Sequence, residues 1–129
     1  MVYAPIPADV ESVAHQCIDA GIHVHRILGP GFREIIYERA FCLELESRGV
    51  SFECEKRIMV RYKSWTIPGQ KIDLIVEGKV LVELKAVPRL RKIHQQQVIS
   101  YLKATDLRLG LLMNFNTRLL REGLKRIVL

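Results

Sequence analysis

The sequence lacks any apolar run long enough to cross a membrane, and it contains few cysteines. A membrane helix needs about 20 consecutive apolar residues, and no stretch of the 129 residues approaches that length. The three cysteines are an odd number without CxxC spacing, which argues against a disulfide framework or a zinc site. The N-terminus lacks the basic flank and apolar core of a signal peptide, so we expect a cytoplasmic protein with no membrane partner.

Acidic residues are also scarce relative to basic ones. Fourteen Asp and Glu face twenty Lys and Arg, which gives a formal net charge of +6 and a pI near 9.5. A surplus of this size on a small domain suits a polyanionic partner such as nucleic acid. The apolar content of 49% and charged content of 26% are those of a globular chain, and the length predicts one domain.

Periodicity predicts three helices. Residues 1–8 carry two prolines and no periodic pattern, so we expect a flexible lead-in followed by a single domain over 9–129. Apolar residues then recur at helical spacing over 9–28, up to the Gly29-Pro30-Gly31 breaker, and again over 32–48 and 90–105. In the second helix, the residues expected to face inward are Ile35, Ile36, Ala40, Phe41 and Leu43.

Segments rich in β-branched and aromatic residues predict the strands. They span 51–63, 65–76 and 79–87, with turn signals at Lys63-Ser64, Pro68-Gly69 and Glu77-Gly78. Two further strands are expected over 107–115 and 124–129, separated by a short polar helix or loop over 116–122. The fold class expected from this order is α+β, with a central mixed sheet flanked by helices.

The predicted strand 79–87 is almost entirely apolar, as in a strand covered on both faces, yet it contains two charges. Glu83 and Lys85 are two residues apart, so their side chains project from the same face. Burying either charge alone costs free energy, which favours either a simple Glu–Lys ion pair or a functional site.

Asp73 decides between these two interpretations. If Glu77-Gly78 alone forms a two-residue loop, Asp73 opposes Val82 and points away from Glu83. If residues 77–79 form a three-residue loop, Asp73 opposes Glu83 and three charges converge. The Glu-Gly-Lys sequence favours the longer loop. Two adjacent carboxylates repel each other unless a cation lies between them, and oxygen ligands favour Mg²⁺ or Mn²⁺ over zinc.

Several motifs in this chain are similar to those of one known superfamily. Asp73, followed after nine residues by Glu83-Leu84-Lys85, resembles the D…ExK signature of the PD-(D/E)XK nuclease superfamily. The segment from Gly31 through Glu34 to Tyr37 resembles the signature of the GxxExxY protein family, a branch of that superfamily. Further resemblance lies in VHRILGPG (24–31), the Gln97-x-x-x-Tyr101 pair, GLLMNFN (110–116) and GLKRIV (123–128), and it extends over residues 10–129.

This resemblance implies a restriction-endonuclease-like fold and Mg²⁺- or Mn²⁺-dependent hydrolysis of DNA or RNA phosphodiester bonds. It implies that Asp73 and Glu83 are the main metal ligands, joined by the carbonyl of Leu84, and that Glu34 reaches the metal directly or through water. Lys85 would be the catalytic lysine. A homodimer is compatible with the resemblance.

Other residues would contact the substrate. The resemblance implies that Gln97 and Tyr101, which lie four apart on one helix face, touch a phosphate or support Lys85. Arg89 and Arg91 follow the catalytic strand and would bind phosphates if they share its face. No aromatic-rich platform for single strands is evident. The four histidines show no metal spacing, so we expect structural or solvated roles for them.

Two other hypotheses stay open at this point. One is a non-catalytic nucleic-acid-binding or regulatory module that retains the nuclease fold. The other is a structural scaffold in which Glu83 and Lys85 form an ion pair, which predicts that Glu83→Gln reduces stability rather than activity.

Overall fold

The computed structural model describes residues 4–129, and over these residues the helices and strands follow the predicted order. The elements are α1 (Ala8–Leu28), α2 (Glu34–Ser47), β1 (Phe52–Tyr62), β2 (Trp65–Val76), β3 (Val80–Lys85), α3 (Lys92–Thr105), β4 (Leu109–Asn114), a short 3-10 helix η1 (Leu120–Gly123) and β5 (Leu124–Val128). In this part of the chain no helix is long and apolar enough to span a bilayer.

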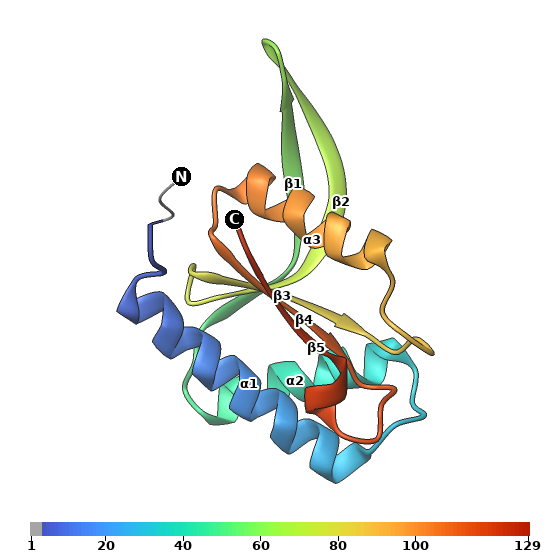
Figure 1. Cartoon of the computed structure of the whole chain (residues 1–129). Coiled ribbons are helices and arrows are strands. Elements are labelled where there is room, and N and C mark those ends of the chain that lie inside the picture. Colours follow the sequence, from blue (N-terminus) through green and yellow to red (C-terminus); the bar gives the residue numbers. More distant parts are fainter. Residues whose placement is uncertain (1–3) are drawn as a thin grey trace.

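The strands form one mixed sheet in the order β1-β2-β3-β4-β5 (Figure 1). Every neighbouring pair is antiparallel except β3 and β4, which are parallel because α3 returns the chain across the sheet. Helices α1 and α2 pack on one face and α3 on the other. Both faces of β3 and β4 are therefore buried, and the predicted α+β class with a helix-flanked mixed sheet is confirmed.

Helix α1 supports the first face of the sheet along its whole length. Its buried residues include Val13, Cys17 and Gly21. Ile27, which helical spacing places on the same apolar face, is 69% exposed instead. The helix ends at Gly29, whose φ of +67° favours glycine. Of the predicted lead-in, residues 1–3 lie outside the described residues, and Arg108 donates hydrogen bonds to the carbonyls of Ala4 and Pro5.

The inward face predicted for α2 is right for two of its five residues, because Phe41 is buried and Ala40 packs partly buried against the core. Three of the residues expected to be buried are exposed: Ile35, Ile36 and Leu43. The buried face consists of the predicted Phe41 together with Tyr37 and Leu45, spaced four apart. Apolar residues surround much of this helix, so composition leaves its rotation open, and the larger aromatic side chains occupy the core.

The Pro68-Gly69 turn signal does not interrupt β2. The register shifts between Arg57 and Met59, where the single β1 residue Ile58 lies opposite two β2 residues, so the bulge is in β2, directly after Pro68. A bulge is a place where a strand tolerates proline. Arg57 Nη1 donates a 2.6 Å hydrogen bond to the Gly69 carbonyl across this bulge. A Cβ at Gly69 would come within 2.7 Å of Ile58 Cγ1, so any larger residue there would force Ile58 to shift.

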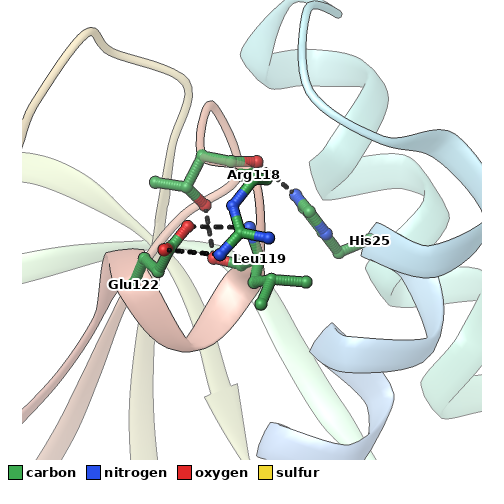
Figure 2. Close-up of polar contacts among 5 residues, drawn as sticks. His25, Arg118, Leu119 and Glu122 are labelled. Atoms are coloured by element: carbon green, nitrogen blue, oxygen red, sulfur yellow. Dashed lines mark hydrogen bonds and ion pairs between the residues drawn. The ribbon is translucent and has the colours of Figure 1, made fainter.

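The connection between β4 and β5 is tied to α1 through His25. Figure 2 shows His25 pointing from α1 toward this connection, where Nε2 donates to the Thr117 carbonyl at 2.8 Å. Within the connection, Glu122 accepts from the Leu119 N–H at 3.1 Å and pairs with Arg118. The structural role expected for His25 is confirmed.

Candidate functional site

The loop between β2 and β3 sets the register of the two carboxylates. It has three residues, Glu77 to Lys79, and is closed by a 2.9 Å hydrogen bond from the Lys79 N–H to the Val76 carbonyl. Gly78 has φ +65°, the left-handed region that the expected glycine position requires. The pairing of Leu74 with Val82 then places Asp73 opposite Glu83, which is the register that the sequence favours.

Asp73 and Glu83 occupy the point at which β2 and β3 separate. The regular ladder between these strands ends at Leu74–Val82. Beyond it, the Asp73 N–H donates to Glu83 Oε1 at 2.9 Å, and the Leu84 N–H donates to Asp73 Oδ2 at 2.8 Å. Each carboxylate thus replaces a backbone partner of the opposite strand, which holds both acids at fixed positions on one face.

Burial raises the pKa of both acids. Glu83 is only 4% exposed, and desolvation, followed by repulsion from Asp73, raises its pKa to about 8. The pKa of Asp73 is raised by its own burial and is lowered in part by the Leu84 N–H and the Lys85 charge. The pair therefore carries less than two negative charges near neutral pH unless a cation binds between them.

Lys85 lies on the same strand face as Glu83, one residue beyond Leu84, and is half-buried at the end of β3. Its charge lowers the pKa of Asp73, Glu83 and Glu34. Among the ion pairs between residues 4–129, none joins Glu83 to Lys85. The simple ion-pair explanation for these two charges therefore lacks the contact it needs.

Helix α2 brings two more carboxylates toward the same point. Burial, followed by the Asp73 charge, raises the pKa of Glu34, the first residue of the helix. Glu38 follows one turn later, and burial together with Asp73, Glu55 and Glu34 raises its pKa to about 7. The sequence analysis did not identify Glu38, although its spacing of four from Glu34 is the signal for a shared helix face.

Tyr37 fixes the approach of α2 to the sheet. Its fully buried ring stacks on Phe115, with 4.7 Å between centroids and 12° between planes. Its hydroxyl donates to the Gly29 carbonyl at 2.6 Å and accepts from the Phe32 N–H at 3.1 Å. Tyr37 therefore joins the end of α1 to the start of α2 and determines where Glu34 lies.

On the opposite side of the strands, α3 contributes Gln97 and Tyr101. Both line a groove of about 760 Å³ between α3 and the β1–β2 hairpin, together with Arg61 and Gln70. Burial raises the pKa of the Tyr101 phenol, and the Glu83 charge raises it further. The Tyr101 end of the groove therefore lies within electrostatic range of Glu83. Helix α3 approaches β4 closely at Gly110, where a Cβ would lie 2.7 Å from Val98 Cγ1.

The segment after β3 carries the predicted arginines. Arg89 and Arg91 are exposed and line a separate hollow beside His94, whose Nδ1 accepts from the Arg91 N–H at 2.9 Å. Asn114, a buried residue that the sequence analysis did not identify, holds the start of this segment. Its side chain donates to the Val87 carbonyl at 2.9 Å and accepts from the Val87 N–H at 3.0 Å.

The donor set suits a hard divalent cation. One oxygen of Asp73 and one of Glu83 accept from backbone N–H groups, so each carboxylate keeps a second oxygen for a ligand. Over residues 4–129, however, no group of three or more acidic, histidine or cysteine side chains is already close enough to hold a metal. Glu34 acts on the pair through its charge but does not complete a ligand cluster.

Comparison with known proteins gives one match that covers nearly the whole chain. The family profile of the PD-(D/E)XK nuclease superfamily matches residues 11–127, which include every residue of the site described above. Comparisons with curated proteins and with solved structures gave no significant match. The chain belongs to the PD-(D/E)XK nuclease superfamily.

Proposed function

We propose that this protein is a divalent-metal-dependent nuclease that hydrolyses phosphodiester bonds in DNA or RNA. The observation that supports this proposal most strongly is the placement of Asp73, Glu83 and Lys85 on one face where β2 and β3 separate. Nucleases of this superfamily generally use divalent metals, and Mg²⁺ or Mn²⁺ suits carboxylate oxygens.

Asp73 and Glu83 would hold the metal, together with the carbonyl of Leu84, and Glu34 would reach it directly or through water. When bound, such an ion would stabilise negative charge on the phosphate and lower the pKa of a bound water. The two hydrogen bonds that fix the carboxylates keep the ligands in place before binding. Preorganised ligands reduce the conformational cost of assembling the site.

Lys85 would then act on the reacting groups from the same face. Its position next to the carboxylates allows it to orient or deprotonate the attacking water, or to balance charge on the phosphate. Gln97 and Tyr101 would contact the substrate phosphate from the groove beside α3. Arg89 and Arg91 would bind phosphates further along the nucleic acid.

We also infer that the chain is a member of the GxxExxY branch, because Gly31, Glu34 and Tyr37 match that signature. The role of Tyr37 as a buried anchor for Glu34 supports this assignment physically. The proposal treats residues 9–129 as the functional unit, in the cytoplasm. A homodimer is compatible with it, and light scattering measures the oligomeric state.

A cleavage assay tests the proposed function. The purified chain is incubated with single- and double-stranded DNA and RNA in Mg²⁺, Mn²⁺ or EDTA. We expect cleavage that requires the metal and falls at least about 100-fold in Lys85→Ala, because the lysine acts in the transition state. Lys125→Ala, which changes an exposed lysine on β5, serves as the matched control and should retain activity.

Two outcomes would contradict this function. Equal product from the wild type and Lys85→Ala would remove the catalytic role of the site. Binding of nucleic acid without cleavage of any substrate would favour the non-catalytic binding module.

A further inference from the structure

The hairpin of β1 and β2 extends beyond the rest of the sheet. We define the arm as residues 57–70, from the register shift at Arg57 to the bulge in β2. Figure 1 shows it projecting past α3 at the top of the molecule. Since β2 pairs with β3 only from Leu74 to Val76, the arm is a two-stranded ribbon. A ribbon of this kind is only marginally stable in water unless something packs on it.

One face of the arm is apolar and exposed. Val60 pairs with Ile67 and Tyr62 pairs with Trp65, so these four side chains share a face, which we call the apolar stripe. All four are exposed, and Tyr62 and Trp65 are the most exposed, at 57% and 62%. A contiguous exposed apolar surface of this kind marks a binding site.

The tip of the arm presents two stacked aromatic rings. The centroids of Tyr62 and Trp65 lie 6.5 Å apart, with 21° between the ring planes. Lys63 lies in the turn, with Nζ 5.4 Å from the centre of the Tyr62 ring. Unpaired bases stack on flat aromatic rings of this kind, and a neighbouring cation can bind the phosphates of the same strand.

The charge of the arm selects the partner. The arm contains three basic residues, Arg57, Arg61 and Lys63, and no carboxylate. Arg57 is used within the arm to hold the bulge, which leaves Arg61 and Lys63 near the tip. A polyanion with aromatic groups, which is to say a nucleic acid with exposed bases, matches both the cations and the rings.

The arm is also continuous with the proposed catalytic site. The groove between the arm and α3 is lined by Met59 and Arg61 on the arm and by Gln97 and Tyr101 on the helix. Tyr101 is near enough to Glu83 for the carboxylate charge to act on its phenol. A strand that follows this groove from the arm would therefore arrive beside the carboxylates.

We propose that the arm binds an unpaired segment of nucleic acid, with bases stacked on Tyr62 and Trp65 and phosphates bound by Arg61 and Lys63. This inference rests on the proposed function, since it assigns a substrate-binding surface to the same site. It names single-stranded regions of DNA or RNA as the favoured substrate class, because bases inside a duplex cannot stack on these rings.

Trp65 provides the direct measurement, because it is the only tryptophan in the chain. The full-length protein in EDTA, which prevents cleavage, is titrated with mixed-sequence 20-nucleotide single strands of DNA or RNA and with the matching duplexes. Stacking of a base on Trp65 is expected to quench its fluorescence. We expect quenching by single strands and at least about ten-fold weaker binding of the duplex.

Variants separate the parts of the arm. Tyr62→Ala with Trp65→Ala is expected to weaken single-strand binding at least about ten-fold, measured by anisotropy of a labelled strand, whereas Trp65→Phe keeps a stacking face and most of the affinity.

Arg61→Ala with Lys63→Ala is expected to reduce the slope of log affinity against log salt concentration by about one to two, since each neutralised phosphate contributes about one. Leu43→Ala and Lys125→Ala, at exposed positions outside the arm, serve as controls.

The outcomes distinguish this inference from the proposed function. If single strands quench Trp65 and bind through the arm but are not cleaved in Mg²⁺, the proposed binding by the arm is supported and the proposed nuclease activity is contradicted. If the protein cleaves nucleic acid but both arm variants bind it as the wild type does, the proposed role of the arm is wrong and the nuclease proposal stands. Tighter binding of duplex than of single strands would have the same meaning. A dimer that Tyr62→Ala with Trp65→Ala converts to monomer would also overturn it, because a second copy would then occupy the stripe.

Discussion

Asp73 and Glu83 each accept a hydrogen bond from the backbone of the opposite strand, at 2.8 Å from Leu84 and 2.9 Å from Asp73 itself. This reciprocal arrangement allows two carboxylates to lie together in a largely buried place. It also concentrates negative charge where the protein has little water to solvate it, and the raised pKa values are the consequence.

The first prediction concerns the pH dependence of stability without metal. The folded state raises the pKa of Glu83 to about 8 from 4.5, so the folded state binds more protons than the unfolded state between these pH values. The unfolding free energy of the wild type should therefore fall as pH rises from about 5 to 8, by on the order of a few kcal/mol. Glu38, whose pKa is raised to about 7, acts in the same direction.

Glu83→Gln supplies the control for this pH effect. The amide keeps an oxygen for the Asp73 N–H but carries no charge, so urea unfolding should give a higher stability than wild type at pH 8 and a similar one at pH 5. A structural ion pair between Glu83 and Lys85 requires the opposite sign. Loss of stability at pH 8 in this variant would therefore favour the scaffold hypothesis.

The second prediction concerns the anchor at Tyr37. In Tyr37→Phe, the Phe32 N–H and the Gly29 carbonyl lose their hydroxyl partner in a buried place. We expect the unfolding free energy to fall by about 1–3 kcal/mol. Urea denaturation measures it, with Tyr62→Phe at an exposed tyrosine as the matched control. Equal losses in the two variants would show that the Tyr37 hydroxyl has no such role.

The third prediction concerns the contact between α3 and the sheet. The added methyl group of Gly110→Ala would lie 2.7 Å from Val98 Cγ1, so either the buried Val98 side chain or helix α3 must shift. We expect the unfolding free energy to fall by about 1–3 kcal/mol, because overpacking a core costs stability of this size. Ser100→Ala, at an exposed position of the same helix, should be nearly neutral in the same thermal melts. A Gly110→Ala protein as stable as the wild type would contradict the close packing.

The fourth prediction concerns Asn114. Its side chain bonds both polar groups of the Val87 backbone, so Asn114→Ala should release the segment that carries Arg89 and Arg91. Hydrogen exchange should become faster at the Val87 amide, and nucleic-acid binding should weaken. Asn116→Ala, at an exposed neighbour, is the control. Unchanged protection of Val87 would contradict this role.

The sequence predicted the order of the elements because the hydrophobic period changes clearly from helix to strand and back. It placed three residues of α2 wrongly, because Ile35, Ile36 and Leu43 are apolar yet exposed. The rotation of the helix is fixed by the tertiary contacts of Tyr37 and Phe41. Pro68 was a misleading turn signal because β2 accommodates it with a bulge, which exists only once the pairing with β1 is set.

The residues of the candidate site were easier to predict from the sequence than the residues around it. The sequence left two loop lengths open between β2 and β3, and the three-residue loop that it favoured is the one that places Asp73 opposite Glu83. The Tyr62–Trp65 stack was missed because two aromatic residues do not stand out in composition. They become a pair only once the turn sets the register of the arm.

The central claim is that Asp73 and Glu83 together bind one divalent ion, and calorimetric titration tests it most directly. Mn²⁺ is titrated into the wild type and into Asp73→Asn, Glu83→Gln and the control Glu53→Gln, an exposed acid on β1. The account predicts binding in the wild type and the control, and affinities at least about ten-fold weaker in the two site variants. Identical heats in all four proteins would contradict it.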